Sequence, residues 1–137
     1  MEIYYTEEKK YTLQQVQRLF HSVQWESANY PTRLYKALEN SPTVITAWKE
    51  EKLIGLINGI DDGELTAYIH YVLVDPLFQG EGIGKELVKK IKEKYREYRY
   101  VLLIAETKEL INYYEKMGFE QKHGQYPMAI LNTANQE

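Results

Sequence analysis

Three glycines at alternate positions, Gly80, Gly82 and Gly84, stand between an apolar segment and a segment of helical periodicity. Because glycine has no Cβ, the backbone N–H groups beside it can approach an anion closely. The N-terminus of a following helix adds four unpaired N–H groups and about half a positive charge. This combination predicts a cradle for a phosphate or pyrophosphate group. The alternative is a tight strand-to-helix turn that binds nothing.

The spacing of these glycines fits neither of two common phosphate-binding motifs. A P-loop requires G-x-x-x-x-G-K-[ST], but Gly80 and Gly84 are one residue too close and Glu86 follows the lysine. A dinucleotide fingerprint requires G-x-G-x-x-G, whereas the chain has G-x-G-x-G. Neither motif therefore describes this loop.

His70 is the natural candidate for a proton acceptor, because imidazole titrates near neutral pH. It lies in the middle of a predicted strand, four residues before that strand ends. The alternative is a histidine satisfied by a neighbouring strand or by solvent, and the residues alone leave both open.

The periodicity of apolar residues predicts the elements that position these groups. Helices are expected from Thr12, which opens a capping box with Gln15, and from Pro31, and over 82–97 and 108–117. Strands are expected over 2–5, 43–48, 53–60, 65–74 and 100–105, with a closing hairpin from Phe119 through 127–131. The 100–105 run is expected to be buried on both faces. The order predicts an α/β fold (an α+β mixed sheet) of about six or seven strands flanked by about four helices.

Length, composition and charge limit the number of domains, the compartment and the kinds of ligand that we expect for this protein. The 137 residues suit one domain over 1–137, and the absence of cysteine agrees with a reducing, cytoplasmic compartment. The N-terminus lacks a secretory pattern, and no apolar run approaches the roughly 20 residues that span a bilayer. The net charge is −3 with acidic and basic residues well mixed, so the composition does not suggest the basic stripe of a nucleic-acid-binding protein. His21, His70 and His123 lack metal-ligand spacing, so no metal is expected.

Two motifs together resemble the GNAT superfamily of N-acetyltransferases. The first is Gln79-x-x-Gly82-x-Gly84, preceded by a strand that ends Val-x-Val-Asp-Pro, and the second is Tyr114-x-x-x-Gly118-Phe119. The resemblance covers at least residues 65–119. The segment around His70 is also similar to the arylalkylamine N-acetyltransferases, which carry a catalytic histidine there.

The resemblance implies that acetyl-CoA is the cosubstrate and lies between two splayed parallel strands, here 65–74 and 100–105. Backbone groups of Val72, Leu73 and Val74 would pair with the pantetheine arm. Backbone N–H groups along the loop would hold the pyrophosphate, from Gln79, Gly80, Glu81, Gly82, Ile83, Gly84 and Lys85. The family often has Asn near position 107, where this chain has Thr107.

The resemblance also implies direct acetyl transfer to a primary amine, with Tyr114 as the general acid. His70 is the first candidate for the base, and Glu106 or Glu26 acting through water is held in reserve. A backbone N–H of Leu73 or Val74 could stabilise the oxyanion.

The acceptor side is expected in the segment from His21 to Tyr35 together with the closing hairpin. Trp25, Tyr30 and Tyr35 could line an aromatic pocket, and Glu26 could meet an ammonium. Ordinary packing is the alternative reading of these residues. The acceptor is expected to be a small-molecule amine or a protein amine. A catalytically inactive CoA-binding sensor module is the alternative function, and a homodimer is possible.

Overall fold

The structure is a computed structural model that describes residues 2–132. The chain separates into two compact units, one that ends at Leu102 and one that begins at Leu103. Each unit is described by itself below. The assignment of residues 1–137 to a single domain stays a prediction.

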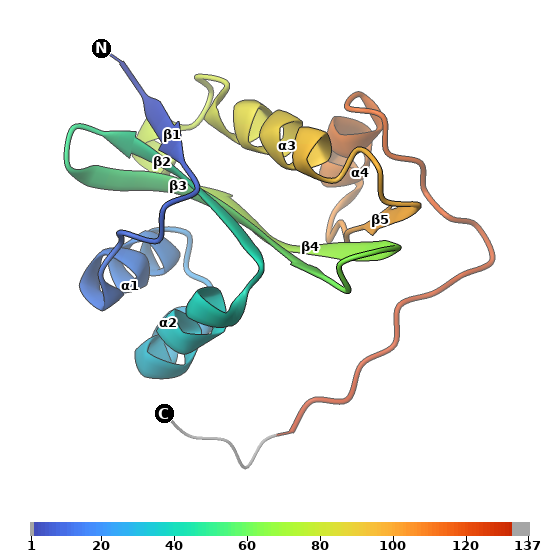
Figure 1. Cartoon of the computed structure of the whole chain (residues 1–137), viewed down its shortest axis with the longest axis horizontal. Coiled ribbons are helices and arrows are strands. Elements are labelled where there is room, and N and C mark those ends of the chain that lie inside the picture. The colour runs from blue at the N-terminus through green and yellow to red at the C-terminus, as the bar shows by residue number, and fades with distance from the viewer. Residues whose placement is uncertain (1, 133–137) are drawn as a thin grey trace. The chain divides into compact units, whose positions relative to one another are not determined.

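The first unit contains a mixed sheet whose strands follow one another in chain order (Figure 1). The strands are β1 (Tyr4–Thr6), β2 (Thr43–Lys49), β3 (Lys52–Asp61), β4 (Thr66–Val74) and β5 (Tyr100–Leu102). The first four are antiparallel to their neighbours, and β5 is parallel to β4. The predicted hairpin of β2 and β3 and the parallel pair of β4 and β5 are confirmed.

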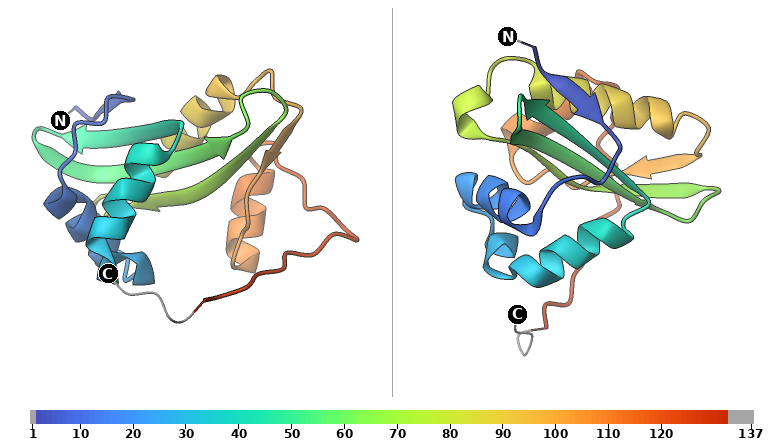
Figure 2. Two further views of the ribbon diagram at one scale, coloured as in Figure 1. Left: turned by 60° about the horizontal axis from the view of Figure 1, so that its bottom comes forward. Right: turned by 60° about the vertical axis from the view of Figure 1, so that its left-hand side comes forward.

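Helices cover both faces of this sheet, as Figures 1 and 2 show. The helices α1 (Leu13–Ser22) and α2 (Pro31–Asn40) lie on one face, and α3 (Ile83–Lys94) lies on the other. Two short 3₁₀ segments connect the elements, η1 (Glu26–Asn29) and η2 (Pro76–Phe78). The second unit contains α4 (Lys108–Glu115).

Local signals start the first two helices as expected. The Thr12 hydroxyl accepts a hydrogen bond from the Gln15 backbone N–H at 3.1 Å, and the Gln15 side chain accepts one from the Thr12 N–H at 2.9 Å. This reciprocal pair is the predicted capping box. Pro31 occupies the first turn of α2, where its missing N–H costs no hydrogen bond.

The core of the first unit fills both sides of the sheet. Leu19, Phe20 and Leu38 pack beneath β3 and β4 in one cluster that includes Leu56 and Leu73. On the opposite face, α3 approaches β3 so closely that a Cβ on Gly55 would lie 3.2 Å from the Cγ2 of Ile83. The glycine in β3 therefore allows the helix that follows the glycine loop to pack directly on the sheet.

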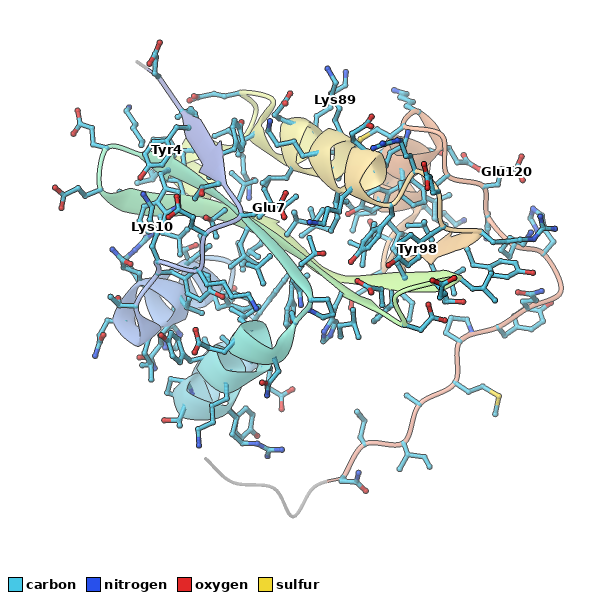
Figure 3. The ribbon with its side chains drawn as sticks, in the orientation of Figure 1. Tyr4, Glu7, Lys10, Lys89, Tyr98 and Glu120 are labelled. Carbon is cyan, nitrogen blue, oxygen red and sulfur yellow. The ribbon has the colours of Figure 1, made fainter. Side chains whose placement is uncertain are left out.

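The end of α3 is bonded to the end of β3 through two phenols. The hydroxyls of Tyr95 and Tyr98 donate to the two carboxylate oxygens of Asp61, at 2.9 and 3.1 Å (Figure 3 labels Tyr98). The Tyr95 ring occupies the space that a side chain at position 59 would need, since a Cβ on Gly59 would clash with the Tyr95 hydroxyl oxygen. These contacts fix α3 against the sheet at the end remote from the glycine loop.

The predicted closing hairpin is wrong. Residues 119–132 contain no strand, and Tyr126, Met128 and Ile130 have 81%, 94% and 87% of their surface exposed. Their alternation resembles a strand, but a strand forms only where a neighbour supplies hydrogen bonds and an apolar cover. The described sheet therefore has five strands and not six or seven.

The predicted strand over 100–105 is also too long, and its burial is wrong. β5 ends at Leu102, and the side chains of Tyr100, Leu102 and Ile104 are about half exposed, at 50%, 47% and 54%. Within the described sheet β5 is an edge strand with a partner on one side only. A continuous apolar run does not reveal from sequence whether an element has one neighbour or two.

Candidate active site

The glycine loop begins at Asp75, directly after the end of β4 at Val74. The Asp75 carboxylate accepts a hydrogen bond from the Leu77 N–H at 2.9 Å and starts η2, and the Gln79 side chain donates to the Val74 carbonyl at 3.0 Å. Gly80 and Gly82 then adopt left-handed conformations, with φ of 84° and 83°. Side chains are strained at such angles, so these two positions require glycine.

The start of α3 leaves backbone donors free for a ligand. Glu86 makes the first helical hydrogen bond, to the Gly82 carbonyl at 3.0 Å, so the N–H groups of Ile83, Gly84 and Lys85 have no partner in a preceding turn. A Cβ built on Gly80 or Gly82 meets no atom within 4 Å. Free donors, the positive end of a twelve-residue helix and open space over the glycines fit the pyrophosphate of acetyl-CoA.

An ion pair holds the start of the loop in place. Arg18 of α1 lies 3.0 Å from the Asp75 carboxylate, and Lys52 of β3 lies 3.9 Å away. Burial alone would raise the pKa of the Asp75 carboxyl. The hydrogen bonds from Leu77 and Arg18 and the two positive charges outweigh burial and lower this pKa below its ordinary value.

The last residues of β4 have one paired edge and one open edge. Val72, Leu73 and Val74 pair with β3. Pairing with β5 covers only Thr66–Tyr68, so beyond Tyr68 the other edge of β4 has no partner strand among residues 2–132. An open edge of this kind can accept an extended ligand as an additional strand, which is the role expected for Val72, Leu73 and Val74.

The centre of β4 contains a β-bulge. Ile57 pairs with Val72 and Gly59 pairs with Ile69, so Asn58 alone lies opposite both His70 and Tyr71. Successive side chains of a regular strand point to opposite faces. Here the rings of His70 and Tyr71 stack on each other with centroids 3.9 Å apart and an interplanar angle of 20°.

These two rings belong to a series of neighbouring rings that we call the aromatic row: Trp25, Tyr71, His70 and Tyr68. The Trp25 ring is tilted by 34° against Tyr71, and the other neighbouring pairs are stacked. Ring centroids are 5.8 Å apart between Trp25 and Tyr71, and 5.5 Å apart between His70 and Tyr68. The hydroxyls of Tyr71 and Ser27 lie 2.8 Å apart and bond η1 to β4. Trp25, predicted on the acceptor side, is therefore brought against Tyr71, the residue that follows His70 in sequence and stacks on its ring.

The other residues predicted on the acceptor side lie in η1, in α2 or between the two, outside the aromatic row. Glu26 is exposed at the start of η1, and the half-buried Tyr30 follows the end of η1 and precedes α2. Their roles stay predictions.

The environment of His70 lowers the pKa of its imidazole. The imidazole is partly covered by its neighbours, and this burial lowers its pKa from the ordinary value of 6.5. A part of the side chain remains exposed to solvent. A neutral imidazole that solvent or ligand can reach is suited to accept a proton.

In the second unit, Tyr114 is buried within α4. Burial, followed by the neighbouring phenol of Tyr113, raises the pKa of Tyr114 to about 12. Its ring packs edge-on against Phe119 with centroids 5.8 Å apart, and the Thr107 hydroxyl caps the helix by accepting from the Leu110 N–H at 3.1 Å. A phenol that stays protonated at neutral pH is suited to donate a proton.

Sequence reasoning missed four residues of this region: Ser27, Asn58, Tyr68 and Tyr71. A signal for the bulge was present, since Asn58-Gly59 interrupts an otherwise apolar strand, and glycine inside a strand often marks a bulge. No sequence signal places Ser27 beside Tyr71.

Two findings concern other kinds of site. Across residues 2–132, no group of three or more His, Cys, Asp or Glu side chains has an arrangement that could hold a metal ion. None of the helices in that range is both long and apolar enough to cross a membrane.

Comparison with known proteins identifies the family. The model of the acetyltransferase (GNAT) family matches residues 10–119. The chain belongs to this family of acetyltransferases, and relatives that it matches are named N-acetyltransferases. The predicted resemblance is thereby confirmed, together with an α/β GNAT fold.

The relatives are similar in sequence over much of the chain. An uncharacterized N-acetyltransferase ycf52 from Pyropia yezoensis is 30% identical over 125 residues, which span 86% of this chain and 70% of that protein. GCN5-related N-acetyltransferase 2, chloroplastic, from Arabidopsis thaliana is 38% identical over 74 residues, 53% of this chain and 28% of that protein. The compartment of this chain stays a prediction.

Solved structures share the fold along almost the whole chain. A GNAT-family acetyltransferase from Streptococcus pneumoniae has a TM-score of 0.84 and 27% identity, and covers 96% of this chain and 99% of its own. A probable acetyltransferase from Staphylococcus aureus has a TM-score of 0.84 and 24% identity, and covers 96% of this chain and 100% of its own.

Proposed function

We propose that the chain transfers the acetyl group of acetyl-CoA to a primary amine, with His70 as the general base. One observation carries this proposal: a neutral imidazole lies in the aromatic row on the same strand as the open edge at Val72–Val74. A proton acceptor and the expected binding edge of the cosubstrate are thus two residues apart.

The cosubstrate would be held by backbone groups. The free N–H groups of Ile83, Gly84 and Lys85 would bind the pyrophosphate at the start of α3, and the left-handed Gly80 and Gly82 would leave room for it. The open edge of β4 would pair with the pantetheine arm. Acetyl-CoA supplies the acyl group as a reactive thioester.

The proton transfers balance with two side chains. His70 takes one proton from the ammonium of the acceptor, which frees the nitrogen lone pair. As the nitrogen–carbon bond forms and the carbon–sulfur bond breaks, Tyr114 gives its proton to sulfur. The second proton of the acceptor nitrogen restores the phenol, and His70 returns its proton to solvent. The assignment of Tyr114 rests on its place in the Tyr114-x-x-x-Gly118-Phe119 motif.

The aromatic row suggests which amines are accepted. Trp25, Tyr71 and Tyr68 offer ring faces and edges beside His70, and aromatic groups pair favourably with such rings. We propose an amine with an aromatic or flat apolar body. Polyamines and amino sugars lack such a body. Among amino acids and protein amines, only some members have one.

The proposal is tested by titrating the protein with acetyl-CoA in a calorimeter and then measuring thiol release against a panel of amines. The panel includes an arylalkylamine, a polyamine, an amino acid, an amino sugar and a lysine peptide. Binding together with turnover of the arylalkylamine is expected. Binding without turnover of any amine would favour the inactive CoA-binding module, and absence of binding would overturn the cofactor assignment.

A further inference from the structure

Asn58 is a polar side chain buried in the middle of β3, with only 2% of its surface exposed. Its strand neighbours are apolar, and it lies opposite Val44 on β2. A buried amide is costly unless all its hydrogen-bonding groups have partners. The hydrogen-bond partners of the Asn58 side chain therefore indicate why an amide is present at this buried position.

Both ends of the Asn58 amide are bonded. The oxygen accepts a hydrogen bond from the backbone N–H of Tyr71 at 2.8 Å, and the nitrogen donates to the Ser41 hydroxyl at 3.1 Å. Ser41 in turn donates to the Ala37 carbonyl in the last turn of α2, at 2.9 Å. The chain of bonds runs from α2 through β3 to the bulge in β4.

The bond to Tyr71 has a specific consequence for the bulge. A bulge leaves one residue without its regular ladder partner, and here the side chain of Asn58 accepts the bond from the Tyr71 N–H. The bulge lets His70 and Tyr71 stack instead of pointing to opposite faces. The amide thus supports the geometry that places the imidazole in the aromatic row.

We infer that Asn58 is a positioning residue for His70, acting through the bulge of β4. It contacts neither acceptor nor cosubstrate in this scheme. The inference concerns where the imidazole lies, and its link to catalysis rests on the proposed role of His70. The titratable groups stacked on the imidazole are the phenols of Tyr68 and Tyr71, and burial is the cause that lowers its pKa.

The experiment compares Asn58→Leu with Thr46→Val. Thr46 is a matched control, because it is a fully buried polar residue on the adjacent strand β2. Its hydroxyl accepts a hydrogen bond from the Trp48 ring N–H at 2.8 Å, and this bond lies within β2 and does not involve β4. Both variants lose buried hydrogen bonds, and both are expected to unfold at lower temperature. Only Asn58→Leu is expected to move His70.

The first readout is the nuclear magnetic resonance spectrum of the His70 ring. Stacked between two phenols, its protons carry ring-current shifts. In Asn58→Leu these shifts are expected to diminish and the pKa of His70 to return toward 6.5, while Thr46→Val leaves both unchanged. Unchanged His70 resonances in a folded Asn58→Leu would overturn the inference.

The second readout is turnover. Displacement of a catalytic group by about 1 Å can cost a hundredfold, so kcat of Asn58→Leu is expected to fall roughly ten- to a hundredfold, with the Kd for acetyl-CoA changing less than about threefold. Altered His70 resonances with unchanged kcat would uphold the positioning role and overturn His70 as the base. The two hypotheses are therefore separable.

A milder variant keeps the inference testable if Asn58→Leu does not fold. Ser41→Ala removes the hydroxyl that orients the amide but leaves the bond from Tyr71 to the Asn58 oxygen. The His70 resonances are expected to move in the same direction by a smaller amount. Resonances identical to those of the unmodified protein would contradict a role for this chain of bonds.

Discussion

The centre and the C-terminal end of β4 contribute to the proposed site by different physical means. At the end, Val72–Val74 and the glycine loop offer backbone groups, and side-chain identity matters mainly where glycine is required. At the centre, the bulge opposite Asn58 brings together side chains from distant parts of the chain. The binding groups at the end of β4 therefore depend on the backbone conformation of the strand and loop. The side chains brought together at its centre depend on the register between β3 and β4.

This difference implies that the two regions should fail in different ways. Damage to the loop is expected to weaken acetyl-CoA binding and to leave the proton chemistry intact. Damage to the aromatic row is expected to slow turnover or weaken acceptor binding at normal acetyl-CoA affinity.

The largest effect is expected from Gly82→Val. The left-handed φ of 83° strains any side chain, and valine would fill the open space over the loop. Loss of two charge-assisted hydrogen bonds, each worth about 1.5–3 kcal/mol, corresponds to a hundredfold or greater rise in the Kd for acetyl-CoA. Calorimetric titration measures this rise.

Gly63→Val is the matched control for Gly82→Val. Gly63 has the same φ of 83° and the same open surroundings, but it lies in the turn between β3 and β4. Both variants are expected to lose stability, and only the change at position 82 should weaken acetyl-CoA binding. Equal affinities in the two variants would remove the loop from the binding site.

The next effect is expected from His70→Gln. Loss of a general base lowers kcat/KM by about a hundredfold. The base acts when neutral, so activity is present above the pKa of His70 and is lost as pH falls through it. Because this pKa is lowered, the acidic limb of the profile should lie below pH 6.5 and disappear in the variant.

His21→Gln provides the control, since His21 is an exposed residue in the last turn of α1. Its pH profile should match that of the unmodified protein. An acidic limb that persists in His70→Gln would assign the base to another group, with Glu106 and Glu26 tested next.

Tyr114→Phe tests a region outside β4. Loss of the proton donor is expected to lower kcat by about ten- to a hundredfold, with little change in the Kd for acetyl-CoA. Tyr113→Phe is the control, because burial also raises the pKa of this adjacent phenol. Equal kcat values for the two variants would argue against Tyr114 as the acid.

The smallest effect is expected from Trp25→Leu. Removing one ring of the aromatic row costs about 0.5–1.5 kcal/mol of aromatic pairing, which corresponds to a rise in KM of roughly tenfold or less for an arylalkylamine. A small aliphatic amine should show no such rise, which makes it the internal control. Equal changes for both amines would mean that Trp25 only packs against Phe20.

Features set by local backbone conformation could be predicted from the sequence, whereas features set by strand register could not. The capping box at Thr12 and Pro31 at the start of α2 are local features, set by residues a few positions apart, and each was predicted correctly. The aromatic row was not predictable, because a one-residue bulge changes which face each side chain joins. Only Asn58-Gly59 hinted at it.

The closing hairpin failed for a related reason. The alternation of Tyr126, Met128 and Ile130 is a local pattern, but a strand requires a partner that the pattern does not specify. The strand predicted over 100–105 was too long for the same reason. An apolar run in the sequence does not specify how many neighbouring strands will pair with it.

The open edge of β4 has a consequence for hydrogen exchange. Amide protons of β4 that point toward β3 are held in a ladder, whereas those beyond Tyr68 that point toward the other edge have no partner strand among the described residues. In deuterated water the strand should therefore exchange in an alternating pattern, slow and fast at successive residues, along the regular segment from Val72 to Val74 that follows the bulge. If acetyl-CoA completes the ladder, the fast positions slow down on binding while the slow ones barely change.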